Sequence, residues 1–329
     1  MTNTSPLPSP IESNVKFFWK TGVFHYFHGL NDIKVQYAYF FNKLTSPSIV
    51  ISSGRCESYL KYQETLYELY QRGYNVFILD HRGQGLSDRL LPNADKGYVK
   101  HFDDYAYDLY TFITTTVLPI TKGKAPYLLA HSMGGAITIR MLQLYPSVIK
   151  RAVLLSPMIG INTGGLPKSV SSKIVIFGKR FNLFFTKNPW YFLGQSNYKV
   201  KNFHQNKLTH SQKRYQTFID LYKRHPEIQL GGVTFHWLYQ ALKIEKKIFL
   251  NLNKIQTPLC ILQASDDNIV DNKIQDLFCN TLHQLSPQLC PEKVIEIEGA
   301  YHELLFEKDE IRSLAIEQLL QFFERSSSD

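Results

Sequence analysis

The chain has 329 residues, of which 44% are hydrophobic, and its formal net charge is +9. This composition excludes a disordered chain and predicts one large globular domain with an insertion, or two average domains. Its four cysteines have no metal-ligand spacing and are too few for a disulfide framework, so we expect reduced thiols and a cytoplasmic protein.

The N-terminal segment "MTNTSPLPSPIESNVKFFWK" is rich in Pro, Ser and Thr and has no apolar core, so it does not predict a secretory signal. No later window approaches the roughly 18 to 20 uninterrupted apolar residues of a membrane-spanning helix. We therefore expect a soluble or peripheral protein, with residues 1–29 as an N-terminal extension. Its strong positive charge favours an anionic membrane surface, nucleic acid or an acidic ligand as partner.

Short runs rich in Val, Ile and Leu alternate with longer amphipathic segments in the first half of the chain. The expected strands are 48–54, 75–81, 127–132 and 151–157, and the expected helices are 59–72, 102–118 and 134–145. This alternation predicts an α/β fold, with a mostly parallel central sheet and helices on both faces.

The alternation stops in residues 159–246, where the chain is aromatic and basic. Positions 158–246 hold 14 Lys or Arg residues against three acidic residues, so the net positive charge of the chain lies there. Two apolar segments, "FNLFFTKNPWYFLG" and "FHWLYQALK", stand out within it. We expect residues 159–246 to form a cap inserted into the α/β domain.

Strands and helices resume after the cap. The expected strands are 258–264 and 293–299, and the expected helices are 272–283 and 309–324. These late strands have no complete sheet of their own, which favours one interrupted domain over two consecutive domains. The predicted core is therefore residues 30–158 and 247–325, followed by a tail at 326–329.

The stretch "LLAHSMGGAI" at 128–137 ends an expected strand at Ser132 and starts the next helix with two glycines. Acyl-transfer hydrolases on parallel sheets place a nucleophilic serine on such a turn in a G-x-S-x-G pattern, because the sharp bend needs small neighbours. Ala130 stands where the first glycine would be and keeps that position small. Ser132 is thus the candidate nucleophile, while His131 beside it should point away and give structural support.

The base and the acid should follow the serine in the order Ser, Asp or Glu, His, each after a later strand. His302 follows the expected strand 293–299 through a turn that contains a glycine, so it is the candidate base. Asp267 lies in the loop after strand 258–264 and is the preferred acid, with Asp266 as the alternative. Asp271 is expected to cap the helix that begins after it.

The oxyanion of a tetrahedral intermediate needs backbone N–H donors. The residue after the nucleophile, Met133, should supply one, and the loop "SGRCES" after strand 48–54 nominates Arg55 for the other. The Arg55 side chain is not needed for that role and is free to meet an anionic group of the substrate.

The segments "GRCESYLKY", "DHRGQGLSDR", "AHSMGGAI" and "GAYHELLFEKD" resemble blocks of the α/β-hydrolase superfamily, in particular its monoacylglycerol-lipase-like branch and bacterial membrane-associated lysophospholipases. The resemblance runs from about residue 30 to residue 325. It implies Ser132, Asp267 and His302 as the catalytic triad, and the amides of Arg55 and Met133 as the oxyanion hole. The block "DHRGQGLSDR" is expected to be structural, and Ser53 replaces the His that many relatives have in this loop.

The resemblance implies hydrolysis of the acyl ester of a lysophospholipid or another single-chain acyl ester, without a metal or other cofactor. The aromatic cap could bury an acyl chain and its basic residues could face lipid phosphates, each contributing about 1 kcal/mol near an anionic leaflet. We therefore expect a peripheral protein on the inner face of the cytoplasmic membrane, and no nucleic-acid partner. A monoacylglycerol lipase, a broad carboxylesterase and a lipid-binding protein without turnover are the alternatives.

Overall fold

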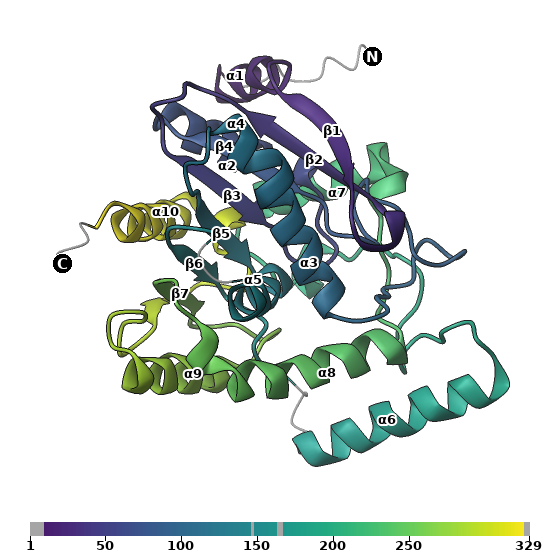
Figure 1. Ribbon diagram of the computed structural model, residues 1–329. Coiled ribbons are helices and arrows are strands. Elements are labelled where there is room, and N and C mark those ends of the chain that lie inside the picture. Colours follow the sequence, from purple (N-terminus) through teal and green to yellow (C-terminus); the bar gives the residue numbers. More distant parts are fainter. Residues whose placement is uncertain (1–9, 146–147, 163–166, 326–329) are drawn as a thin grey trace, which may run out of the picture.

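A twisted sheet with helices on both faces forms the body of the molecule (Figure 1). The computed structural model describes residues 10–145, 148–162 and 167–325. Its sheet has eight strands in the order β1-β2-β4-β3-β5-β6-β7-β8. The strands are β1 (Val23–His28), β2 (Lys34–Phe40), β3 (Ser48–Ser52), β4 (Asn75–Leu79), β5 (Tyr127–His131), β6 (Ala152–Leu155), β7 (Leu259–Ala264) and β8 (Ile295–Ile297).

Only the pairs β1–β2 and β2–β4 are antiparallel among the described strands; from β4 to β8 every neighbouring pair is parallel. The central strands β3 to β7 are buried along their whole length, as expected for strands covered on both faces. The predicted mostly parallel sheet is confirmed. Its carboxyl-end loops meet at one edge, where sites of such folds are usually built.

The helices cover the two faces of the sheet unequally. They are α1 (Pro10–Trp19), α2 (Gln63–Gln71), α3 (Asp103–Phe112), α4 (Leu118–Ile120), α5 (Met133–Leu144), α6 (Lys168–Phe185), α7 (Gln212–Arg224), α8 (Phe235–Leu250), α9 (Asn272–Leu285) and α10 (Asp309–Glu324). Buried side chains of α3, α5, α8 and α9 share one apolar cluster with the sheet, and those of α2 and α10 share the other. The sheet is therefore the middle of three layers.

The N-terminal part of the sheet differs from the expectation. Residues 23–28, expected within an extension, form the edge strand β1, which pairs along its length with β2. Five of its six residues are exposed, so the strand lacks the buried apolar pattern by which the later strands are found. The sheet thus begins at residue 23 rather than at residue 30 or later.

The expected cap region contains α6, α7 and most of α8. The boundary at residue 246 falls inside α8, because this helix continues to Leu250. Its buried side chains Trp237, Ala241, Ile244 and Ile248 recur at helical spacing and belong to the main apolar cluster. Helix α8 therefore packs as part of the core, and α6 lies outside it (Figure 1). Of the helices in the described ranges, none combines the length and apolar character needed to cross a membrane.

Candidate active site

Ser132 occupies the turn between β5 and α5, at the carboxyl edge of the sheet. Its backbone has φ 51° and ψ −115°, a conformation that residues with a side chain rarely adopt. The Ser132 N–H donates to the Leu155 carbonyl at 3.0 Å, and the Ser132 carbonyl accepts from the amides of Gly135 and Met158, each at 2.9 Å. These bonds hold the serine in its strained turn.

The glycines after the serine are required by close backbone contacts. A Cβ atom on Gly134 would lie 2.1 Å from the Ser52 carbonyl oxygen, and one on Gly135 would lie 2.6 Å from the Cβ of Pro157. Helix α5 can therefore start directly beside β3 and β6 only with glycine at both positions. Ala130, by contrast, is fully buried within β5, where its methyl group is accommodated.

The structure brings Ser132, His302 and Asp267 into one hydrogen-bonded chain. The His302 Nε2 atom lies 2.9 Å from the Ser132 Oγ atom, and His302 Nδ1 lies 2.6 Å from Asp267 Oδ2. Ser132 is 7% exposed and His302 is 3% exposed, so water is largely excluded from these contacts. This is the geometry that lets an imidazole accept a serine proton while a carboxylate holds its other nitrogen.

Asp267 is held in place by its second carboxylate oxygen. Oδ1 accepts hydrogen bonds from the amides of Ile269, at 2.7 Å, and Val270, at 3.2 Å. Burial raises the pKa of the Asp267 carboxyl, but the hydrogen bond and charge of His302, with these two amides, outweigh burial and lower it below its ordinary value. Asp267 is therefore an anion at neutral pH.

The two neighbouring aspartates have other contacts. Asp266 is exposed, and its carboxylate lies near the Ser265 hydroxyl rather than near His302. Asp271 occupies the N-cap position of α9 as expected, but its side chain makes no capping hydrogen bond and instead pairs with Lys168 at 3.4 Å. Of the three aspartates in this loop, Asp267 is the one that contacts His302.

The Arg55 and Met133 amides lie in the two segments that flank Ser132 at the sheet edge. Met133 is the first residue of α5, so the helix offers its N–H no acceptor. Arg55 lies in the loop after β3, which turns at Cys56 with φ 62°. For neither amide is a hydrogen-bond acceptor found in the part of the chain that the structure describes. Two unused donors beside a serine match the needs of an oxyanion.

The Arg55 side chain contacts two residues within 159–246, the region expected to form the cap. Its Nη2 atom donates to the Gly231 carbonyl at 2.5 Å, and its guanidinium lies 5.3 Å from the centre of the Trp237 ring. A cation over an indole face is a favourable contact in a buried place. The side chain thus connects the loop after β3 to Gly231 and to helix α8.

The segment "DHRGQGLSDR" packs as an internal support. The Asp80 carboxylate accepts hydrogen bonds from the Ser58 hydroxyl at 2.9 Å and from the amides of Tyr59 and Leu86 at 2.5 and 2.7 Å. Burial nevertheless raises the pKa of Asp80 to about 7. Arg82 pairs with buried Asp108 through two hydrogen bonds. These contacts agree with the structural role expected for this segment.

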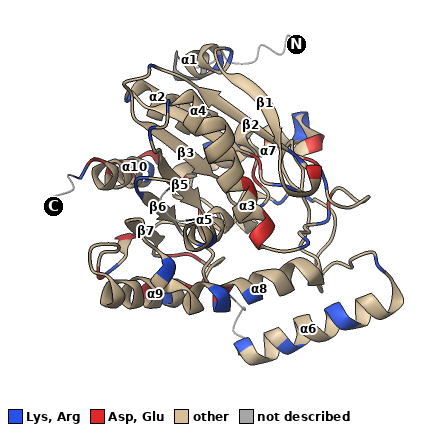
Figure 2. Ribbon diagram, viewed as in Figure 1, with Lys and Arg blue, Asp and Glu red and all other residues tan. Residues whose placement is uncertain are grey.

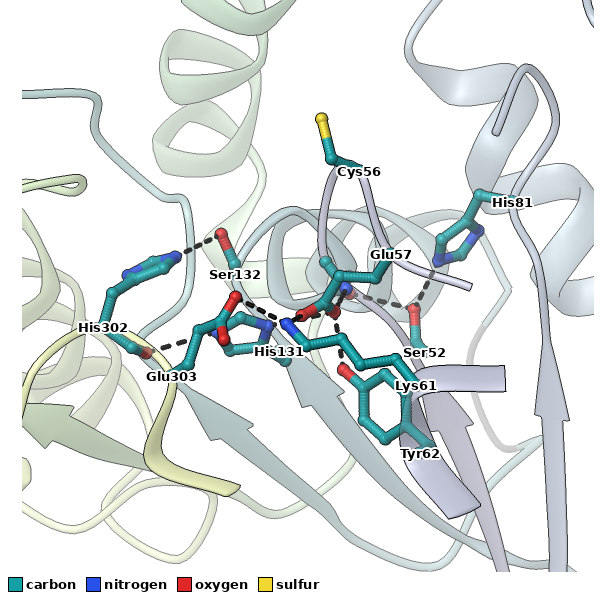
Figure 3. A network of polar contacts seen from close by, with 12 residues as sticks. Ser52, Cys56, Glu57, Lys61, Tyr62, His81, His131, Ser132, His302 and Glu303 are labelled. Carbon is teal, nitrogen blue, oxygen red and sulfur yellow. Dashed lines mark hydrogen bonds and ion pairs between the residues drawn. The ribbon is translucent and has the colours of Figure 1, made fainter. Parts of the chain in front are cut away.

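A buried polar cluster below the serine was not foreseen. It consists of Glu57, Lys61, Tyr62, His131 and Glu303, which Figure 3 shows next to the Ser132–His302 pair. Lys61 and Glu303 lie 242 positions apart in the chain, so no local pattern indicates that they meet. The one available signal was the charged character of "GRCESYLKY" next to the expected oxyanion loop.

Within the described ranges, no group of three or more His, Cys, Asp or Glu side chains is arranged to hold a metal ion.

Comparison with known proteins places this chain among hydrolases. Residues 45–309 match the family model described as "Serine aminopeptidase, S33". Lysophospholipase L2 of Escherichia coli (strain K12) is 36% identical over 311 residues, which cover 94% of this chain and 90% of that protein. Monoglyceride lipase of Rattus norvegicus is 28% identical over 272 residues, 82% of this chain and 80% of that protein.

Solved structures agree on the fold. A crystal structure of a soluble variant of monoglyceride lipase from Saccharomyces cerevisiae, in complex with a substrate analog, has a TM-score of 0.69 to this chain at 18% identity. The match covers 91% of this chain and 93% of that one. At this identity the likeness supports a shared α/β-hydrolase fold.

Proposed function

The chain belongs to the serine aminopeptidase S33 family of α/β hydrolases, and from this premise we propose that it hydrolyses the acyl ester of lysophospholipids. The products are a free fatty acid and a glycerophospho-alcohol. The observation that carries the proposal is the continuous chain of hydrogen bonds from Asp267 through His302 to Ser132, in a relative of lysophospholipase L2.

In the proposed acylation step, Ser132 Oγ attacks the ester carbonyl carbon while His302 Nε2 takes the hydroxyl proton. The amides of Arg55 and Met133 donate to the oxyanion that forms. When the intermediate collapses, the bond to the glycerol oxygen breaks and His302 returns the proton to that oxygen. Asp267 keeps Nδ1–H oriented and stabilises the imidazolium while it exists.

The proposed deacylation step repeats this sequence with water. His302 removes a proton from a water molecule, which attacks the acyl carbonyl carbon, and the same two amides bind the second oxyanion. Collapse releases the fatty acid and returns the proton to Ser132 Oγ. One base therefore serves each step, and the enzyme returns to its starting protonation state.

We further propose that a cap within residues 159–246 provides contact with lipid, through a surface on α6 that we call the α6 face. It consists of the exposed apolar side chains Ile176, Phe177, Phe181, Leu183, Phe184 and Phe185 of the helix and Trp190 beyond it. Phe177 is 68% exposed and Phe184 is 83% exposed. Contiguous exposed apolar patches on a globular protein mark binding surfaces.

Aromatic contacts within the α6 face make it continuous. The ring of Phe181 lies 5.8 Å from that of Phe177 and 4.8 Å from that of Phe185, and Phe185 stacks on Trp190 at 6.2 Å. The opposite side of the helix packs on α8, where Gly178 contacts the Phe235 ring. One side of α6 is therefore fixed to the protein and the other is aromatic and uncovered by the described residues.

The charge of α6 favours an anionic lipid surface as the partner of this face. Residues 168–185 contain Lys168, Lys173, Lys179 and Arg180 but no acidic residue, as Figure 2 shows. Amphipathic helices with basic and aromatic side chains lie at membrane interfaces. We propose that the protein is cytoplasmic and acts as a peripheral protein on the inner face of the cytoplasmic membrane.

A second candidate activity is hydrolysis of monoacylglycerols, which the 28% identity to monoglyceride lipase favours. The same acylation and deacylation steps would serve this substrate, since the two esters differ only in the phosphorylated headgroup. A headgroup preference therefore separates the two activities.

The deciding experiment compares purified wild type with Ser132→Ala on a lysophospholipid, a monoacylglycerol with the same acyl chain, a short soluble ester and an aminoacyl amide. We expect wild type to turn over the lysophospholipid fastest, and Ser132→Ala to lose activity by on the order of a thousandfold or more. A fluorophosphonate should label wild type and leave the variant unlabelled. Near-native activity of folded Ser132→Ala would overturn the assignment of the nucleophile, and faster turnover of the monoacylglycerol would favour the second activity.

A further inference from the structure

Glu57 lies at the centre of the buried cluster and joins its own segment, which follows β3, to His131 at the end of β5 (Figure 3). Its Oε2 atom accepts hydrogen bonds from the Gly54 amide at 2.5 Å and the Tyr62 hydroxyl at 2.6 Å, and lies 3.2 Å from His131 Nδ1. Its Oε1 atom accepts from Lys61 Nζ at 3.0 Å. Glu57 is 2% exposed, so these partners replace water entirely.

The His131 ring lies between two groups that can only accept hydrogen bonds. On one side is the Glu57 carboxylate, and on the other the backbone carbonyl oxygen of His302, 3.2 Å from His131 Nε2. A neutral imidazole carries one N–H and could satisfy only one of these contacts. For both hydrogen bonds to form, Nδ1 must carry a proton toward Glu57 and Nε2 must carry a proton toward the His302 carbonyl.

We propose that His131 is held as an imidazolium and that the Glu57–His131 ion pair is a positioning pair. It keeps the loop after β3, which contains Arg55, and the loop after β8, which contains His302, correctly placed relative to Ser132. The proposal rests on the ester hydrolysis proposed above, because it assigns a role in that reaction to two residues that touch neither substrate nor the reacting atoms.

The charges around the pair support an imidazolium. The groups that face His131 are Glu57, Lys61 and Tyr62 from the segment after β3, and Glu303 and the His302 ring from the loop after β8. Lys61 Nζ also donates to Glu303 Oε1 at 2.6 Å. Two carboxylates, one ammonium and one imidazolium sum to zero, whereas a neutral His131 would leave one buried negative charge uncompensated.

The directions of the pKa shifts of His131 and Glu57 agree with an ion pair between them. Burial lowers the pKa of His131, but the charge and hydrogen bond of Glu57, with the charge of Glu303, raise it above its ordinary value. Burial raises the pKa of Glu57, but Lys61 and His131 bring it well below the usual range. His81 is an internal contrast, because it is equally buried and burial lowers its pKa to about 3.

The pair joins the segments whose relative placement matters for the reaction. Glu57 fixes the Gly54 amide, one residue before Arg55, and a Cβ atom on Gly54 would lie only 2.7 Å from His131 Nδ1. His131 directly precedes Ser132 and holds the carbonyl of His302. A displacement of about 1 Å at such groups can cost on the order of a hundredfold in rate. The pair should therefore act on kcat and leave KM for a small ester unchanged.

The first test measures the protonation of the His131 ring by ¹⁵N NMR of histidine-labelled protein, from neutral to mildly alkaline pH. The signals are assigned by their absence in His131→Gln. We expect each ring nitrogen of His131 to be protonated in wild type and the ring to be neutral in Glu57→Gln, while the His81 ring is neutral in each protein. A neutral His131 ring in wild type would overturn the imidazolium, whether or not the enzyme cleaves lysophospholipids.

The second test measures kcat and KM of Glu57→Gln and Glu57→Asp on a soluble ester, per site labelled by the fluorophosphonate. The fluorophosphonate labels only folded, competent sites. A substitution that merely reduces the folded fraction of the protein therefore leaves kcat per labelled site unchanged. We expect roughly a 10- to 100-fold lower kcat for Glu57→Gln with unchanged KM, and partial recovery in Glu57→Asp, which keeps the charge. Asp108→Asn is the matched control, since it removes a buried carboxylate paired with Arg82 away from the site. An unchanged kcat per labelled site in the two Glu57 variants would overturn the positioning role.

Discussion

Asp267 uses one carboxylate oxygen for His302 and the other for its own loop: Oδ2 lies 2.6 Å from His302 Nδ1, and Oδ1 accepts the Ile269 and Val270 amides. The two amides fix which oxygen faces the histidine. A carboxamide at this position would keep its carbonyl oxygen on the amides and turn its NH₂ group toward Nδ1.

Asp267→Asn should therefore force the wrong His302 tautomer and lower kcat by on the order of 10⁴, the size known for the equivalent change in chymotrypsin-like proteases. Steady-state kinetics on a soluble ester measure this loss. Asp266→Asn is the control and should keep nearly full activity, because Asp266 is exposed and contacts Ser265. A larger loss in Asp266→Asn than in Asp267→Asn would reverse the choice of acid.

The pKa of Asp80, raised by burial to about 7, predicts a specific pH dependence of stability. Between the ordinary carboxyl pKa near 4 and this value, the folded state binds a proton that the unfolded state has lost. Asp80 therefore contributes stability at acid pH that is lost as the pH rises through about 7, with a slope of up to about 1.4 kcal/mol per pH unit.

Urea denaturation of wild type and Asp80→Asn across this pH range checks the sign. The carboxamide cannot titrate, so the difference in unfolding free energy between the two proteins should shift in favour of the variant as the pH rises. A difference that is constant over the range, or that shifts in favour of wild type, would contradict the assignment.

The turn at Ser132 predicts opposite outcomes for two changes at adjoining small residues. Gly134→Ala places a Cβ atom 2.1 Å from the Ser52 carbonyl oxygen, a backbone atom that cannot move aside cheaply. We expect little folded protein, or a strongly lowered melting temperature. Ala130→Gly removes one buried methyl group and should cost about 1 kcal/mol of stability while retaining activity. Loss of activity in stable Ala130→Gly would show that the methyl group positions the serine.

The α6 face predicts lipid binding that depends on aromatic side chains and on charge. Phe177→Ser with Phe184→Ser should weaken binding to phosphatidylglycerol vesicles by up to about a thousandfold, since each buried aromatic side chain contributes about 2 kcal/mol. Vesicle sedimentation measures the change, and hydrolysis of a soluble ester should be unaffected. Phe17→Ser is the control, because Phe17 is 74% exposed on α1, at the opposite end of the molecule from α6 (Figure 1).

Neutralising Lys173 and Arg180 should weaken binding to the same vesicles by about 1 kcal/mol for each residue and reduce its sensitivity to salt. Binding to phosphatidylcholine vesicles should change little. Unchanged binding of the aromatic and basic variants would exclude the α6 face as the lipid contact. If wild type is a dimer and the Phe177→Ser, Phe184→Ser variant is a monomer, the α6 face would instead be the contact with a second copy of the chain.

The central part of the fold could be predicted because its strands are short, apolar and buried on each side, which leaves a plain pattern in the sequence. Ser132, Asp267 and His302 follow three such strands, and the sheet brings the ends of parallel strands to one edge. Strand β1 could not be predicted in this way, because its side chains are mostly exposed. The expected cap boundary at residue 246 falls inside helix α8, because the basic and aromatic composition that defines the cap does not reveal that the buried helical spacing continues to Ile248.

Contacts between distant segments could not be predicted from one sequence. Glu57, Lys61 and Glu303 have the composition of ordinary surface charges, and their burial follows only from the packing of the loops after β3 and β8. Asp267 could be favoured over Asp266 by its depth in the loop, but the amides of Ile269 and Val270 that orient it depend on the path of that loop. The role of the Arg55 side chain likewise depends on where the cap lies.

Arg55 connects the loop beside Ser132 to two distant parts of the chain. Its guanidinium holds the carbonyl of Gly231 and the ring of Trp237, whereas its own amide belongs to the loop beside Ser132. A displacement of the segment around Gly231 would therefore act on the residue whose amide lies in the loop beside Ser132. The placement of this amide and the position of the segment around Gly231 are thus linked through a single residue.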